Sequence, residues 1–261
     1  MIFFIHIPKT AGTTFYEVVK KNHASFLKPK LNNLSELDLN MLPHQSAIRL
    51  PGGYYSAPQT LNMMLDSSSL DKPAFIGGHV GYGFHHAYDT TVRYISFVRE
   101  PKERLISDYN EHCKPGRFFY DQLREKQFDI NYYLELVLND HLDNIMTRQI
   151  AGPYDFYLHE RTEVSNKLYQ RALGNMPNIT FFSQENFDKA LMYMFKEFKW
   201  SQLGYERKNV AKPYGTVTKN LNESLLEEVI QYDLKLFNEI TVVNNSKLSK
   251  IEKVLFKLKT W

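Results

Sequence analysis

A lysine, a glycine and several threonines stand together close to the first residue of the chain. Residues 8–14 read PKTAGTT, between a short apolar run and a segment with helical spacing. The N-terminus of a helix presents unbonded N–H groups and a partial positive charge, and the hydroxyls and the lysine add further donors. The segment therefore predicts a site for a phosphate-like anion. The candidate anion-binding residues are Lys9, Thr10, Ala11, Gly12, Thr13 and Thr14.

Two features of this segment limit the interpretation. Thr13 could equally cap a plain turn between a strand and a helix, without any ligand. The lysine also precedes the glycine, whereas in the ATP- and GTP-binding pattern GxxxxGK(S/T) the lysine follows it. We therefore expect an anion other than the phosphates of ATP or GTP.

A second anion site is predicted at Arg99, which follows the apolar run 94–98. Enzymes that use a nucleotide with Mg²⁺ usually carry an aspartate near such a strand end. The planar fork of an arginine binds pairs of phosphate oxygens instead. Ser107, two helical turns further on, could donate to the same anion. The alternative is a surface ion pair of Arg99 with Glu100 or Glu103.

His79 follows the pair Gly77-Gly78 and is the candidate general base. The ordinary pKa of histidine lies near neutrality, so this side chain can accept the proton of an attacking hydroxyl. A capping or core role is the alternative. His85 and His86 compete for the same role because they are close in sequence, and His85 is also a candidate substrate contact.

Two further arginines lie in segments with helical spacing. Arg148 is a candidate substrate-binding residue that could contact an acidic acceptor, or it could pair with Asp143 or Asp155. Arg104 and Asp108 are four residues apart, a spacing at which we expect a structural ion pair on the helix surface.

The elements that must position these residues alternate along the chain. Apolar runs predict strands at 2–7, 74–76, 92–98 and 178–182. Helices are predicted from apolar spacing and end signals at 13–21, 102–112, 131–138, 141–150, 161–173, 186–198, 222–237 and 247–258. Loops are expected at 113–128 and 200–217.

This alternation predicts an α/β fold, in which a P-loop-like parallel β-sheet is flanked by helices on both faces. Such sheets bind ligands at the carboxyl ends of their strands, where the segments carrying Lys9, His79 and Arg99 fall. No linker is evident, so we expect a single domain over residues 1–261. Residues 32–71 are rich in Asn, Ser, Pro and Gly and form an excursion that we expect to carry acceptor contacts or a lid.

Composition narrows the class of protein. The net charge of +3, from 32 basic and 29 acidic residues, is too small to indicate nucleic-acid binding. Cys113 is the single cysteine, so no internal disulfide can form and we expect a reducing, cytoplasmic location. We find no secretory signal and no apolar stretch near the ~20 residues of a membrane span. No cluster of metal ligands is evident either.

Taken together, these segments resemble the PAPS-dependent sulfotransferases, where PAPS is 3′-phosphoadenosine-5′-phosphosulfate. The likeness is nearest to the carbohydrate 2-O-sulfotransferase branch that acts on heparan and dermatan. The 5′-phosphosulfate loop of that family has the form PKTxxT(S/T), which is matched by Pro8, Lys9, Thr10, Thr13 and Thr14. Its 3′-phosphate motif has the form FVRxPxxRxxSxY, which is matched by Phe97, Val98, Arg99, Pro101, Arg104, Ser107 and Tyr109.

Two weaker similarities lie further along the chain. GHVGYG, which begins one residue before His79, is similar to the family segment GHxxY, whose histidine is the catalytic base. DNIMTRQIAG, residues 143–152, is similar to a segment of the form NxxTRxLxG. Eukaryotic members carry a membrane anchor and often disulfides, and this chain shows neither. We therefore expect a compact microbial relative.

The resemblance implies a reaction and a role for each candidate. PAPS would be the sulfuryl donor and PAP the product, the acceptor would be a hydroxyl of a carbohydrate or glycolipid, and no metal would take part. Lys9 would neutralise the leaving oxygen and His79 would take the proton. The loop from Gly12 would hold the 5′-phosphate, and Arg99 with Ser107 the 3′-phosphate. A late loop with Lys208 and Asn209 would close over the nucleotide.

Two other functions remain compatible with the sequence. A nucleotide-dependent kinase or other P-loop phosphotransferase would share the anion loop and the fold. A non-catalytic module that binds a glycan or nucleotide would keep the anion sites but would not need His79.

Overall fold

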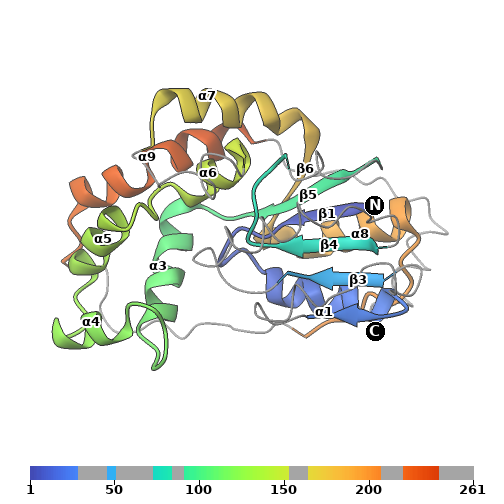
Figure 1. The fold of residues 1–261 in the computed structure, drawn as a ribbon, viewed down its shortest axis with the longest axis horizontal. Coiled ribbons are helices and arrows are strands. Elements are labelled where there is room, and N and C mark those ends of the chain that lie inside the picture. Colours follow the sequence, from blue (N-terminus) through green and yellow to red (C-terminus); the bar gives the residue numbers. More distant parts are fainter. Residues whose placement is uncertain (29–45, 51–72, 84–90, 153–163, 207–219, 241–261) are drawn as a thin grey trace, which may run out of the picture.

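The centre of the protein is one parallel sheet of six strands (Figure 1). The structure is a computed structural model and describes residues 1–28, 46–50, 73–83, 91–152, 164–206 and 220–240. The strand order is β2-β3-β4-β1-β5-β6, and every pairing is parallel. The strands are β1 (Ile2–Ile5), β2 (Phe26–Leu27), β3 (Ser46–Arg49), β4 (Pro73–Gly78), β5 (Arg93–Val98) and β6 (Ile179–Ser183).

β1 lies in the middle of the sheet, between β4 and β5. Ile5 is opposite Gly78 of β4 and Ser96 of β5, so the chain leaves these three strands at the same edge. The chain also crosses over β1 when it passes from β4 to β5. Such a change of direction opens a crevice at the carboxyl ends of the strands, where ligands of α/β sheets bind.

Helices cover both faces of the sheet, as predicted. The helices are α1 (Gly12–Asn22), α3 (Pro101–His112), α4 (Tyr120–Glu125), α5 (Ile130–Asn139), α6 (Ile145–Ala151), α7 (Asn166–Asn175), α8 (Phe187–Phe198) and α9 (Glu223–Glu239). Short 3₁₀ turns lie at Met176–Asn178 and Gln184–Asn186.

The side chains of β1 alternate between the two faces of the sheet, and each face packs against a different set of helices. Ile2 and Phe4 belong to an apolar cluster that includes residues of α1 and α8. Phe3 and Ile5 point to the opposite face, where the cluster includes residues of α3, α5, α6 and α9. These β1 side chains are at most 4% exposed, so the central strand is buried on both faces.

Four elements, α4, α6, β2 and β3, differ from the expectations. The expected loop 113–128 contains α4, whose Leu123 is fully buried and anchors this short helix. The expected helix 141–150 begins only at Ile145, because Asn144 adopts a left-handed conformation. β2 and β3 were not expected. The expected helix 247–258 lies outside the described residues, as does most of the excursion 32–71. Within the expected loop 200–217, residues 200–206 contain no helix or strand.

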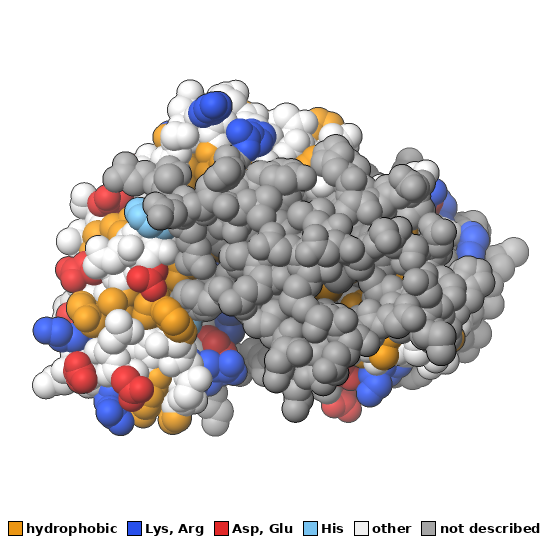
Figure 2. Space-filling view, in the orientation of Figure 1, with side chains coloured by type: hydrophobic (Ala, Val, Ile, Leu, Met, Phe, Trp, Pro, Cys, Tyr) orange, Lys and Arg blue, Asp and Glu red, His pale blue; other side chains and the backbone are white. Residues whose placement is uncertain are grey.

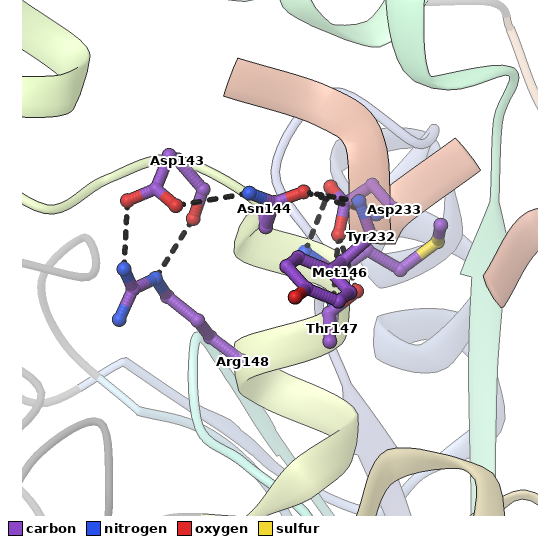
Figure 3. Close-up of polar contacts among 7 residues, drawn as sticks. All are labelled: Asp143, Asn144, Met146, Thr147, Arg148, Tyr232 and Asp233. Atoms are coloured by element: carbon purple, nitrogen blue, oxygen red, sulfur yellow. Dashed lines mark hydrogen bonds and ion pairs between the residues drawn. The ribbon is translucent and has the colours of Figure 1, made fainter. Parts of the chain in front are cut away.

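The start of α6 is fastened to α9 by a buried polar network (Figure 3). The Asp233 carboxylate accepts hydrogen bonds from the backbone N–H groups of Met146, at 3.2 Å, and Thr147, at 2.7 Å. In return the Asn144 side-chain oxygen accepts from the backbone of Tyr232 and Asp233. Asp233 thus supplies partners for first-turn N–H groups of α6, which have none within their own helix, and this fixes where α6 begins.

Within the described ranges, none of the helices combines the length and the apolar character needed to cross a bilayer.

Candidate functional site

The loop after β1 has left-handed backbone angles at two residues. Lys9 and Ala11 both have left-handed φ angles, of 67° and 73°. Such angles are strained for residues other than glycine, and strain of this kind collects at ligand sites. Ala11 is the N-cap residue of α1 and offers no side-chain hydrogen bond. The capping role considered for Thr13 is therefore not found, and the polar end of the helix faces the loop.

Two loop residues have structural tasks that the sequence did not reveal. The Thr10 hydroxyl is buried and donates to the carbonyl oxygen of Ile7 at 2.7 Å. This hydrogen bond stabilises the turn between the two residues. Gly12, a predicted anion-binding residue, also has a packing role: a Cβ at this position would lie 2.0 Å from Nε2 of His6, so the glycine makes room for that ring.

His79 is held in one tautomer by the end of β1. Its Nδ1 lies 2.8 Å from the carbonyl oxygen of His6. A carbonyl only accepts, so Nδ1 carries the proton, and in the neutral ring Nε2 is then the basic nitrogen. The His6 and His79 rings stack with centroids 4.2 Å apart. The ring is therefore held with Nδ1 protonated and Nε2 unprotonated.

The surroundings keep both histidines neutral. Burial lowers the pKa of His79 to about 4, and the charge of Arg49 adds to this effect, whereas the hydrogen bond to His6 and the charge of Asp108 oppose it. Burial also lowers the pKa of His6 well below its ordinary value, with help from His79, Arg49 and Lys9. His79 is thus not close to its titration point at neutral pH, contrary to expectation, and its proton-accepting form dominates.

Arg49 is a site residue that sequence analysis missed. It ends β3 at the same edge of the sheet, and its guanidinium carbon lies 4.4 Å from the centre of the Tyr16 ring. Its charge acts on His6 and His79. The residue fell within the segment treated as an excursion. The run SAIR, an apolar stretch ending in arginine like the one at Arg99, was the available signal.

Arg99 lies after β5, where it was expected. Its Nε is 3.3 Å from Oε2 of Glu103, so the surface pair considered as an alternative is present. Pairs of this spacing contribute only about 0.3–0.5 kcal/mol, so a phosphate could displace the glutamate. Glu100, the other alternative, instead accepts from the first N–H groups of α3.

A contact between the loop and α3 brings the two predicted anion sites to the same edge. Nζ of Lys9 lies 3.2 Å from Oε2 of Glu111 in the last turn of α3. Ser107 is half-buried and precedes Glu111 by four residues, so both lie on one face of the helix. The face that carries Ser107 therefore approaches the loop that carries Lys9.

Two arginines are parts of the packing. Arg148 is 1% exposed and donates to the carbonyl oxygen of Asp143 at 2.8 Å and to its carboxylate at 2.7 Å (Figure 3). This position does not support the contact with an acceptor that the sequence predicted. Arg104 lies 3.9 Å from Asp108, and the arginine side chain is only 2% exposed, so this pair is buried rather than on the helix surface.

Five of the residues considered lie outside the described part of the chain: His85, His86, Asp155, Lys208 and Asn209. Among the described residues, no three side chains of the metal-binding types gather into a site. On the described part of the face in Figure 2, acidic and basic side chains are interspersed, which differs from the one-signed surface typical of nucleic-acid binding.

The fold and this edge together define an α/β protein with a candidate anion-binding loop, a neutral histidine and two arginines at its strand ends. A profile of the sulfotransferase family matches residues 1–137, more than half of the chain. The protein therefore belongs to the sulfotransferase family, as predicted. The matched residues include Lys9, His79 and Arg99.

The chain is also similar to heparan sulfate 2-O-sulfotransferase hst-2 of Caenorhabditis elegans, with 32% identity over 110 residues. The match covers 42% of this chain and 31% of that protein, so it spans about a third of the relative. This similarity supports the predicted position near the 2-O-sulfotransferase branch.

Replacing Gly12 by alanine should destabilise the protein by about 1–3 kcal/mol, because the new methyl group would overlap the His6 ring. Urea denaturation at neutral pH measures the change. Gly174→Ala in α7 is the matched control, since a Cβ there meets nothing within 4 Å. In a helix this substitution should be neutral or stabilising by up to about 1 kcal/mol. Equal midpoints for the two variants would contradict the packing argument.

Proposed function

We propose that the protein transfers the sulfuryl group of PAPS to a hydroxyl of a carbohydrate by in-line displacement. The observation that carries this proposal is the meeting of three segments at adjacent strand ends. The loop with Lys9 follows β1, His79 follows β4, and Arg99 follows β5. In this proposal, one edge of the sheet would supply two groups of anion ligands and a base.

The residues of this edge fit the charges of such a donor. The uncapped start of α1, the half-exposed Thr13 and the cation of Lys9 suit the 5′-phosphosulfate. Arg99 and Ser107 suit a separate 3′-phosphate, the group that distinguishes PAPS from ATP. When bound, the donor supplies an activated sulfur whose bond to the 5′-phosphate oxygen breaks. Lys9 would neutralise the charge that develops on that oxygen.

His79 would act on the acceptor. The acceptor oxygen forms the new bond to sulfur, and its proton passes to Nε2 of His79. The proton on Nδ1 remains in the hydrogen bond to His6, which prevents the ring from turning. Because the ring is neutral, it is ready to accept without first losing a proton.

A carbohydrate acceptor is proposed because the C. elegans relative is named for heparan sulfate. A glycolipid would present the same chemistry. Arg49 lies beside the two histidines and could contact the acceptor there. The location of the reaction is proposed to be cytoplasmic, on the strength of the single cysteine.

Incubation with labelled PAPS and a panel of unsulfated and partly sulfated glycans tests the proposal directly. Transfer of label to a glycan hydroxyl, unaffected by EDTA, is the expected result. Thermal stabilisation by ATP with Mg²⁺ but not by PAP would favour a kinase. Binding of PAP without any turnover would favour a non-catalytic module.

The Arg99→Ala variant should bind PAP more weakly by about 1.5–3 kcal/mol, because a charged hydrogen bond to the 3′-phosphate is lost. Binding of adenosine-5′-phosphosulfate, which lacks that phosphate, should hardly change. Isothermal titration calorimetry measures both. Arg93→Ala is a suitable control because Arg93 begins the same strand at the opposite edge. An equal loss for both ligands would remove the 3′ assignment.

The His79→Ala variant should lose roughly 10²- to 10⁴-fold in turnover while it still binds PAP. In the wild type, activity should fall only as the pH drops through about 4, since burial holds the pKa of His79 at that value and the ring is neutral above it. The measurement is the pH profile of kcat/KM, with the folded state checked by circular dichroism. An acidic limb near pH 6.5 would instead indicate an ordinary, exposed histidine.

The same pKa shift predicts how stability depends on pH. His79 takes up its proton near pH 6.5 in the unfolded chain but only near pH 4 in the folded protein. The unfolded state therefore binds more protons between these values, and stability should fall as the pH is lowered through this window.

A further inference from the structure

Glu111 gathers three cations around one carboxylate. Its Oε2 lies 3.2 Å from Nζ of Lys9 and 2.7 Å from Nζ of Lys114, and its Oε1 is paired with Arg117. Three positive charges and one negative charge leave this group of side chains with a net charge of +2. The structure thus holds excess positive charge at the lysine that is proposed to face the donor.

This group of contacts differs from ordinary surface pairs. The Lys9 and Glu111 side chains are each only 20% exposed, and they join segments 102 residues apart in the sequence. Burial alone would raise the pKa of Glu111, but the three cations outweigh it and lower the pKa to about 2. The carboxylate is therefore ionised at neutral pH.

The position of Glu111 on α3 connects it to both predicted anion sites. Arg99 lies just before the helix, Ser107 lies in its middle, and Glu111 lies in its last turn. In Figure 1 the loop after β1 reaches from the sheet toward α3. The Lys9–Glu111 contact is the described side-chain pair that joins this loop to the helix.

We propose that Glu111 is a positioning residue for Lys9. Glu111 holds the lysine in place before the donor binds, and the lysine then leaves Glu111 to pair with the anionic donor. The inference rests on the proposed function. The contact that must break is the longer of the two lysine contacts at Oε2, and Lys114 and Arg117 remain to pair with the carboxylate afterwards. When Lys9 leaves, the Glu111 carboxylate still has two cationic partners. The free-energy cost of breaking the Lys9–Glu111 contact is therefore small.

This role predicts opposite effects on binding and on turnover. Without the negative charge the cluster carries +3, and Lys9 no longer has to leave a partner, so donor binding should tighten. Lys9 also loses the contact that orients it, so fewer bound complexes have the lysine in place to stabilise the leaving oxygen, and turnover should fall. A purely structural residue would not produce this combination.

The test is the isosteric variant Glu111→Gln, compared with the wild type for PAP binding by calorimetry and for turnover of PAPS. We expect the Kd for PAP to fall roughly three- to tenfold, with a steeper dependence on salt, and kcat to fall about tenfold. The matched control is Asp121→Asn, which removes one charge from an exposed pair with Arg124 on α4 and should change neither quantity.

A second pair of variants shows whether Glu111 acts through the lysine. In a Lys9→Met background, the addition of Glu111→Gln should leave kcat unchanged, because the residue being positioned is absent. A further tenfold loss in that background would overturn the proposal, as would weaker PAP binding by a folded Glu111→Gln variant. Wild-type values of both Kd and kcat for Glu111→Gln would overturn it too.

These outcomes are separate from failure of the proposed function. If the wild type neither binds PAP nor transfers sulfuryl, the proposed function fails. If the wild type does both and only the Glu111 variants contradict expectation, the positioning role alone is wrong.

Discussion

The backbone of His6 joins the two strands on which the candidate site is built. Its N–H donates to the carbonyl oxygen of Gly78 at 2.8 Å, and its own carbonyl accepts from the ring of His79. The end of β1 and the end of β4 are therefore held together at the point where the loop begins and the base follows. If this contact were lost, neither the tautomer of His79 nor its distance from the loop would be set.

Two glycines leave room for the side chains that pack around the ends of β1 and β4. A Cβ at Gly12 would overlap the His6 ring, and a Cβ at Gly78 would lie 2.8 Å from Leu50. Gln149 of α6 adds a further donor, 3.3 Å from the His6 carbonyl. Asp233 of α9 fixes the start of α6, and the buried Gln149 of α6 contacts the His6 carbonyl. The packing of α6 on α9 therefore helps to position this part of the candidate site. The scaffold far from the loop thus contributes to its geometry.

The charges at this edge are arranged around neutral histidines. The positive charges of Lys9 and Arg49 both disfavour protonation of His6, and the charge of Arg49 also disfavours protonation of His79. Glu111, in contrast, is held as an anion by its three cations. Burial is the main reason that both histidines stay unprotonated, and the nearby cations, which could also meet an anionic ligand, act in the same direction.

The sequence by itself determined the class of fold and predicted three segments that the structure brings to one edge of the sheet as a candidate site. Continuous apolar runs at β1 and β5, with helical spacing after each, were sufficient because buried parallel strands and amphipathic helices follow local patterns. PKTAGTT and the run ending in Arg99 were recognisable because chemistry restricts which residues can bind an anion. Only the tertiary structure decided the partners: the role of Gly12, the burial of Arg148, the approach of Arg49 and the pairing of Lys9 with Glu111. The pairing of Lys9 with Glu111 joins segments that are distant in the chain. The contacts of Gly12 with His6 and of Arg148 with Asp143 are closer in sequence, but they depend on how the chain turns between the two residues, which residue types alone do not specify.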